Sequence, residues 1–219
     1  MAPKKAAKCS RNSRYLVPGG PSPDDHWIAT PHSTHMALTR TPVCEFGRPA
    51  PEFSLPDAEG KIWSLQDCRG DRATLVMFIC NHCPYVKAVC DALVRDVRSL
   101  AATGVRAVGI MPNDYANYPE DAPEKMLEFA RVHGFTFPYL IDATQEVARA
   151  YGAVCTPDFF GYDRDLRLQY RGRLDATTPG RAAPQGSPRE LLEAMTLIAE
   201  TGHGPEQQAP SMGCSIKWR

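Results

Sequence analysis

The segment from Thr74 to Gly104 constrains the fold more than any other part of this chain. It begins with Thr74–Ile79, a continuous apolar run of the length expected for a strand buried on both faces. A helix pattern follows at once, with apolar side chains at i, i+3, i+4 and i+7 from Val86 to Leu100, and Gly104 ends it. A buried strand that runs directly into an amphipathic helix predicts an α/β domain.

The rest of the chain from Pro51 continues this alternation. Strands are predicted at Val105–Met111, at Tyr139–Ile141, from Phe159 onward and at Leu166–Tyr170, the last as an edge strand. Helices are predicted to open at Asp121 as an acidic N-cap, at Gln145, and at Ser187 in a capping box with Pro188 at N1. Two short strands around a turn at residues 57–60 add an N-terminal hairpin. The predicted fold is a central mixed sheet flanked by helices.

The net charge of the chain excludes some functions, and the distribution of its prolines indicates the domain boundaries. The 25 basic and 25 acidic side chains cancel, which argues against a nucleic-acid binder or a membrane-surface protein. Nine of the 20 prolines lie before residue 57, so residues 1–43 are predicted to form a disordered arm. We expect one domain over residues 44–202 and a tail, residues 203–219, that docks on it. With no secretory apolar segment and eight cysteines at irregular spacings, we expect a cytoplasmic protein with reduced thiols.

Cys83 is the strongest candidate for chemistry. Pro84 suits the first position of the helix, which makes Cys83 the N-cap. A sulfur there faces unpaired amides and the positive end of the helix dipole, and both stabilise the reactive thiolate. His82 could add a positive charge, and Cys80 completes a Cys-x-x-Cys pattern. The alternative is that Cys83 is a small buried hydrophobic residue, as most intracellular cysteines are.

Four segments together resemble the peroxiredoxin-like branch of the thioredoxin superfamily, the redoxin group related to alkyl hydroperoxide reductase and thiol-specific antioxidant proteins. They are Asn81–Lys87, Cys155–Phe160, Tyr170–Asp175 and Pro210–Trp218. The resemblance extends from about Phe46 to the C-terminus. It implies a thioredoxin fold in which Cys83 attacks the substrate and Pro157 is a cis-proline facing it. It also implies that Thr156 presents its backbone to a bound thiol or substrate.

The resemblance further implies an enzyme that is a thiol peroxidase or a thiol–disulfide oxidoreductase. Its substrate would be a peroxide or a disulfide, its reductant would be of the thioredoxin or glutathione type, and it would need no organic cofactor. Peroxiredoxins carry a threonine where this chain has Cys80, and their catalytic arginine aligns with Pro157. Arg173 is a candidate to replace the missing charge.

Two questions stay open at this point. The thiol that resolves oxidised Cys83 could be Cys80, Cys155 or Cys214, which we rank in this order, or it could belong to a partner molecule. Cys80 ranks first because a Cys-x-x-Cys pair across a tight turn can meet the geometry of a disulfide. The second question is metal: Cys80, His82 and Cys83 could instead bind copper or zinc, and metal delivery is the alternative function.

Overall fold

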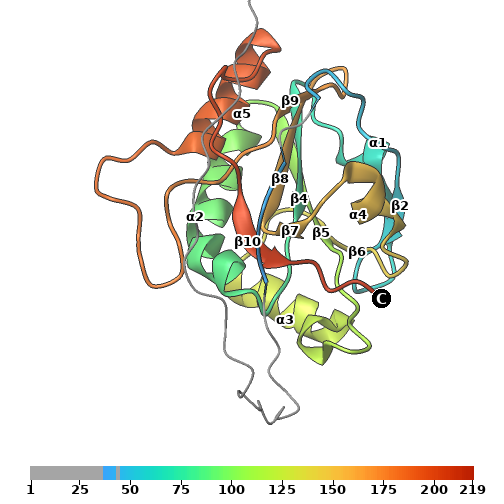
Figure 1. Ribbon diagram of the computed structural model, residues 1–219. Helices are drawn as coiled ribbons and strands as arrows, with labels where there is room; N and C mark the ends of the chain where they lie inside the picture. The colour runs from blue at the N-terminus through green and yellow to red at the C-terminus, as the bar shows by residue number, and fades with distance from the viewer. Residues whose placement is uncertain (1–36, 43–44) are drawn as a thin grey trace, which may run out of the picture. The chain divides into compact units, whose positions relative to one another are not determined.

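The computed structural model describes residues 37–42 and 45–219, and Figure 1 labels its elements. The predicted arm, residues 1–43, therefore lies largely outside the described residues. One part of it corrects the predicted boundary, because Leu38–Arg40 forms strand β1. The partner of this strand is β10 (Met212–Ser215), at the opposite end of the chain. A pairing between the two ends of a sequence leaves no local pattern, so it could not be predicted.

Strand β4 (Ala73–Phe78) lies in the middle of a five-stranded mixed sheet with the order β6-β5-β4-β8-β9. The strands β5 (Val105–Met111) and β6 (Tyr139–Ile141) continue the sheet in parallel. On the other side, β8 (Asp158–Asp163) and β9 (Leu168–Tyr170) are antiparallel, and β9 is the edge strand. The prediction of a central mixed sheet is confirmed.

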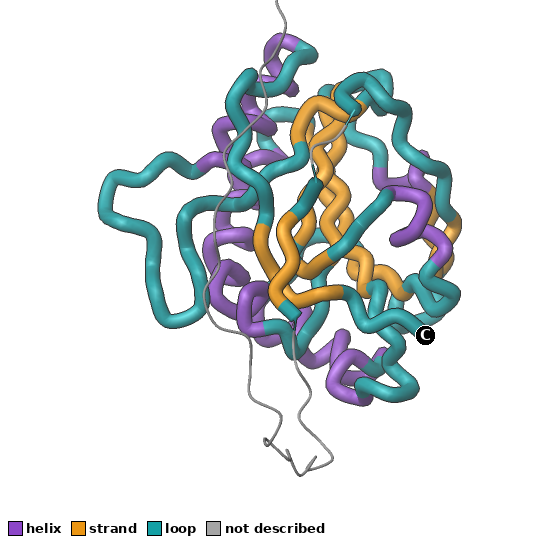
Figure 2. Tube along the Cα trace, in the orientation of Figure 1, coloured by secondary structure: helices purple, strands orange, loops and turns teal. Residues whose placement is uncertain are grey.

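Alternate side chains of β4 enter two different cores, one on each face of the sheet. Leu75 and Met77 pack with helices α2 (Pro84–Ala101), α3 (Pro123–His133) and α5 (Glu190–Thr201). Val76 and Phe78 pack with α1 (Leu65–Cys68), α4 (Glu146–Tyr151) and the hairpin of β2 (Ser54–Pro56) and β3 (Ile62–Ser64). Figure 2 shows the strands between these two groups of helices. Both faces are covered, which explains why β4 is apolar from Leu75 to Phe78.

A second, smaller sheet has the order β1-β10-β7, where β7 is Cys155–Thr156. In its ladder Cys214 lies opposite Thr156, and Ser215 lies opposite Cys155. The C-terminal tail is thus joined to the domain by a strand, visible beside β7 in Figure 1. This arrangement brings the C-terminal cysteine to the segment that precedes Pro157.

Two helices begin later than the sequence predicts. The N-cap of α3 is Ala122, and Asp121 instead ends a short 3-10 turn, η1 (Pro119–Asp121), where it is fully buried. Asp121 does not cap α3 because its carboxylate binds Asn81, Asn113 and His82 instead. Helix α5 has Arg189 as its cap, and the Glu193 carboxylate accepts from the Arg189 amide at 3.1 Å, so the Ser187 capping box does not form. Among the described helices, none combines the length and apolar character needed to cross a bilayer.

Candidate active site

Cys83 is the N-cap of α2, as the Cys-Pro pattern predicts, and it follows the turn after β4. Its side chain is fully buried, and the thiol donates to the Thr156 carbonyl oxygen at 3.0 Å. Helix α2 also packs against β10, so the C-terminal strand covers this sulfur. The site therefore lies between the mouth of a helix and the edge of a strand, a position that both orients and encloses the thiol.

Three sulfur atoms meet here. The thiols of Cys214 and Cys80 and the backbone amides of Val86 and Cys214 all lie near enough to the Cys83 sulfur to stabilise its thiolate. These donors lower the pKa of Cys83, with Cys214 the largest cause and Cys80 the second, against the opposing effect of burial. The Cys80 sulfur is also 3.2 Å from the Thr156 hydroxyl. Cys83 can thus exist as a thiolate that accepts several hydrogen bonds, the form that acts as a nucleophile.

The Thr156–Pro157 peptide bond is cis, as the resemblance implies. The Thr156 backbone faces Cys83 through its carbonyl, and its side chain faces Cys80. Ser211, just before β10, donates from its hydroxyl to the Pro157 carbonyl at 2.7 Å. The loop around Pro157 is therefore fixed on one side by the cysteine turn and on the other by the tail.

Cys155 lies away from the reactive sulfur. Neighbouring residues in a strand point to opposite faces, and Thr156 takes the face toward Cys80 and Cys83. The Cys155 thiol instead donates to the Pro157 carbonyl at 3.5 Å, and burial raises its pKa. The structure brings Cys80 and Cys214 to Cys83, and it places Cys155 on the other side of β7.

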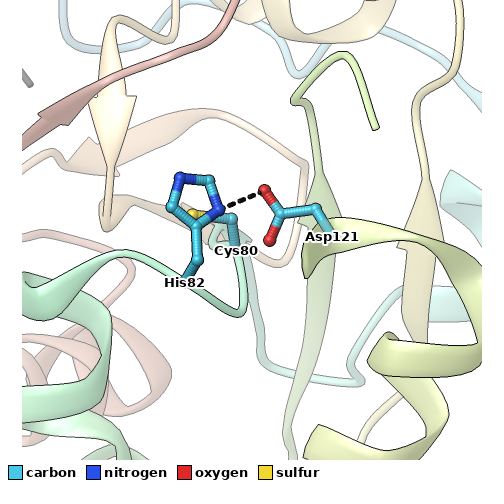
Figure 3. A group of neighbouring side chains, drawn as sticks. All are labelled: Cys80, His82 and Asp121. Carbon is cyan, nitrogen blue, oxygen red and sulfur yellow. Dashed lines mark ion pairs between the residues drawn. The ribbon is translucent and has the colours of Figure 1, made fainter. Parts of the chain in front are cut away.

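Asp121 is a residue of this site that the sequence analysis assigned to a helix cap. Figure 3 shows its carboxylate beside His82, with Cys80 next to both. The His82 Nδ1 lies 2.7 Å from the Asp121 carboxylate, and this contact raises the pKa of His82. The imidazole also stacks on Tyr118, with ring centroids 6.0 Å apart. His82 therefore carries positive charge more readily than a free histidine, close to Cys83.

Asp121 also fixes the turn that carries the cysteines. Its carboxylate accepts from the Asn81 amide at 2.8 Å and from the Asn113 side chain at 2.8 Å. Asn81 in turn accepts from the Tyr139 hydroxyl at 3.0 Å. The sequence contains an indication of this role. Residues 113–121 follow β5 and Cys80 follows its parallel neighbour β4, so both lie at the same end of the sheet. The N-cap pattern at Asp121 competed with it.

Two arginines of the segment Tyr170–Asp175, Arg171 and Arg173, are paired with carboxylates. Arg171 is buried and binds Asp158 at 2.9 Å and the Gly152 carbonyl at 2.7 Å. Arg173 binds Glu190 with two of its nitrogen atoms, at 2.6 to 3.1 Å. It lines a cavity of about 200 Å³ together with Pro157. Arg173 thus lies beside the site, but its charge is balanced by Glu190.

The residues that could hold a metal are engaged in other contacts. Cys80, His82 and Asp121 have ligand atoms within 4.8 Å of one another, so Asp121 stands where the sequence suggested Cys83. However, His82 is paired with Asp121, and Asp121 already accepts two further hydrogen bonds. Cys80 interacts with Thr156 and Cys83. The arrangement favours thiol chemistry over metal delivery.

An acidic cysteine at the mouth of the first central helix, opposite a cis-proline in a mixed sheet, defines a thiol-dependent oxidoreductase of thioredoxin fold. A family model described as the AhpC/TSA family matches residues 46–171. This chain belongs to the AhpC/TSA family.

Individual relatives agree with this assignment. A Mycobacterium tuberculosis protein, provisionally named as a peroxiredoxin, is 36% identical over 126 residues, which cover 57% of this chain and 74% of the relative. An uncharacterized conserved protein from Geobacillus kaustophilus has a crystal structure with 45% identity and a TM-score of 0.79, covering 84% of this chain and 97% of its own. The thioredoxin domain of a thiol-disulfide oxidoreductase from Bacteroides vulgatus shares the fold, with 17% identity, a TM-score of 0.50, and coverage of 59% and 89%.

Proposed function

We propose that this enzyme acts mainly as a thiol–disulfide oxidoreductase, with Cys83 as the nucleophile and peroxide as a slower substrate. One observation carries the proposal. The Cys83 sulfur lies against the Thr156 carbonyl, beside cis-Pro157, with two further thiols in contact with it. This geometry suits the transfer of a disulfide between sulfur atoms, because the nucleophile and a second thiol that can attack it are already side by side.

The proposed reaction begins when the Cys83 thiolate attacks one sulfur of a substrate disulfide. A bond forms between Cys83 and that sulfur, the substrate S–S bond breaks, and the other substrate sulfur leaves as a thiolate. Attack by a second thiol on Cys83 then releases the remaining half of the substrate. An external reductant, either one thioredoxin-type dithiol or two glutathione-type monothiols, reduces the resulting disulfide and returns the enzyme to its starting state.

Peroxide can enter the same cycle. The Cys83 thiolate would attack one peroxide oxygen, the O–O bond would break, and Cys83 would become a sulfenic acid. The departing oxygen develops negative charge, which a nearby cation or hydrogen-bond donor must stabilise. Arg171 and Arg173 are both bound to carboxylates, which supports a slow reaction with peroxide. His82, whose pKa is raised by Asp121, lies next to the nucleophile in sequence and is the remaining candidate to stabilise that charge.

The cytoplasm is the compartment we propose, because reduction of the active-site thiols needs a dithiol pool. The proposal rests on the use of the cysteines as working thiols and on nothing else in the fold.

The test compares two oxidants on the fully reduced protein. Thiol loss is followed after mixing with hydrogen peroxide and, separately, with glutathione disulfide, for wild type, Cys83→Ser and Cys90→Ser. Cys90 is a matched control because it is also buried on α2, with its pKa raised by burial to about 12. We expect Cys83→Ser to lose both reactions and Cys90→Ser to keep both. Loss of neither reaction in Cys83→Ser would refute the role of Cys83.

A further inference from the structure

Strand β10 places Cys214 in the position that a bound substrate thiol would take. Cys214 lies directly opposite Thr156 in the ladder between β10 and β7. The Cys83 thiol donates to the carbonyl of that same Thr156. Strand β10 packs against α2, and Cys83 and Cys214 lie in the same buried cluster. Each thiol is near enough to the other to be the largest cause of its shifted pKa.

The close approach of the two strands depends on Gly213. A Cβ atom at this position would lie 2.1 Å from the Thr156 carbonyl oxygen, far inside van der Waals contact with rigid backbone. Any other residue would force β10 away from β7. The backbone is therefore adapted to bring the next residue, Cys214, close to the nucleophile.

The tail on either side of Cys214 is held in place. Before it, the Thr41 amide donates to the Ser211 carbonyl and the Ser211 amide donates to the Thr41 hydroxyl, both at 3.1 Å. After it, the Ile216 amide donates to the Val154 carbonyl at 3.2 Å and the Lys217 amide donates to the Asn113 side chain at 2.9 Å. Cys214 thus reaches Cys83 with no ordering of a mobile tail, which would cost about 1–2 kcal/mol per residue fixed.

We propose that Cys214 is the resolving cysteine of this enzyme and that the oxidised resting form carries a Cys83–Cys214 disulfide. This inference rests on the proposed function, since Cys83 must first be oxidised by a disulfide or a peroxide. It reverses the order expected from the sequence, in which the neighbouring Cys80 ranks first.

The covalent step balances for either oxidant. When Cys83 holds half of a substrate in a mixed disulfide, the Cys214 thiolate attacks the Cys83 sulfur, and the substrate half leaves as a thiolate. When Cys83 is a sulfenic acid, the Cys214 thiol condenses with it, an S–S bond forms, and water leaves. In both cases two electrons have passed from the protein thiols to the oxidant, and the external thiol reductant later restores them.

The causes of the two pKa values favour Cys214 over Cys80 as the second thiol. The pKa of Cys214 is raised chiefly by its hydrogen bond to Cys83, whereas Lys217 and the Tyr85 amide lower it. Once Cys83 is oxidised, its negative charge is gone and the chief obstacle to ionising Cys214 disappears. The pKa of Cys80 is raised chiefly by burial, and next to it lies the Asp121 carboxylate, so its obstacle remains.

The chain's tryptic peptides allow a direct test. Cys80 and Cys83 both lie in the peptide of residues 73–87, and Cys214 lies in the peptide of residues 190–217. A Cys80–Cys83 disulfide would therefore stay within one peptide, whereas a Cys83–Cys214 disulfide would join two. The protein is reduced, treated with one equivalent of hydrogen peroxide or of glutathione disulfide, blocked at acid pH and digested without reduction.

We expect the joined peptide to dominate in wild type and in Cys80→Ser. In Cys214→Ser we expect a long-lived sulfenic acid, or a glutathione adduct, on Cys83. A dominant internal disulfide in residues 73–87, or a reduced Cys214 beside fully oxidised Cys83, would overturn this inference while the proposed function stands. A Cys83 that reacts with neither oxidant would instead overturn the proposed function and this inference with it.

Discussion

At the residue scale, replacing Asp121 distinguishes its effect on the pKa of His82 from its effect on the stability of the fold. Its carboxylate raises the pKa of His82 through their contact, so the pair stabilises the fold fully at pH below the unfolded histidine pKa of 6.5. This contribution is lost as pH rises through the higher pKa of folded His82. We expect Asp121→Asn to lower the pKa of His82 and to cost about 1–3 kcal/mol of unfolding free energy, part of it independent of pH.

Urea denaturation across this pH range and a histidine NMR titration would measure both effects. Asp91→Asn is the matched control, because Asp91 pairs with His133 at 3.1 Å on an exposed surface. It should leave the stability unchanged. An Asp121→Asn protein with an unchanged His82 pKa would contradict the assigned pairing.

Cys214 should tune the acidity of Cys83, since its hydrogen bond is the largest cause of the lowered pKa. Cys214→Ala removes this donor and should raise the pKa of Cys83. Cys214→Ser keeps a hydroxyl donor and should raise it less. The thiolate absorbance in the ultraviolet, followed against pH, would show the order wild type, Ser, Ala. An identical profile for all three would exclude Cys214 as a donor.

At the element scale, the fit of β10 against β7 controls both the cover over Cys83 and the position of Cys214. Gly213→Ala should push β10 from β7, because the added Cβ has no room beside the Thr156 carbonyl. We expect faster alkylation of Cys83 and less Cys83–Cys214 disulfide, with no thiol removed. Ser215→Ala in the same strand is the control and should behave as wild type. Unchanged alkylation in a folded Gly213→Ala protein would show that β10 does not cover the nucleophile.

The helices and strands also show which elements local sequence patterns can predict and which they cannot. The run of β4 and the helix of α2 are local patterns, so the central sheet and the N-cap position of Cys83 could be predicted from them. The cis bond at Pro157 was implied only by the family resemblance. Strand β10 pairs with β7 and with β1, and its sequence Met212–Ser215 has neither alternation nor an apolar run. Its role depends on contacts between distant segments, which no window of sequence contains.

Local sequence patterns also could not predict the directions in which the side chains of the site point. The spacing of Cys80 and Cys83 suggested a pair, but only the strand register shows that Cys214 faces Cys83 and that Cys155 does not. The sequence predicts Asp121 as a helix cap, but its carboxylate accepts a hydrogen bond from the Asn81 amide and pairs with His82. Competing partners of one carboxylate can be ranked only when their positions in space are known.

At the scale of the whole molecule, the site should favour disulfides over peroxides. The positions of the peroxiredoxin threonine and arginine hold Cys80 and Pro157, and Arg171 and Arg173 are paired with carboxylates. Stopped-flow measurement should therefore give a rate constant for hydrogen peroxide far below about 10⁷ M⁻¹s⁻¹, the upper range of enzyme efficiency. A value at or above that level would mean that other groups stabilise the departing oxygen.

The most direct test of Cys83 as the acidic nucleophile is its rate of alkylation by limiting iodoacetamide at several pH values between about 5 and 8. Fragmentation of the peptide of residues 73–87 distinguishes Cys83 from Cys80, and the neighbouring peptide reports Cys90. Burial lowers the alkylation rate of each cysteine by a factor that does not depend on pH, so the change of that rate with pH reports ionisation of the thiol. If Cys83 is already a thiolate, its rate will be the highest and nearly independent of pH, while Cys90, with its pKa raised to about 12, will gain about tenfold per pH unit. Parallel slopes and equal labelling of Cys83 and Cys90 at every pH would contradict the central claim.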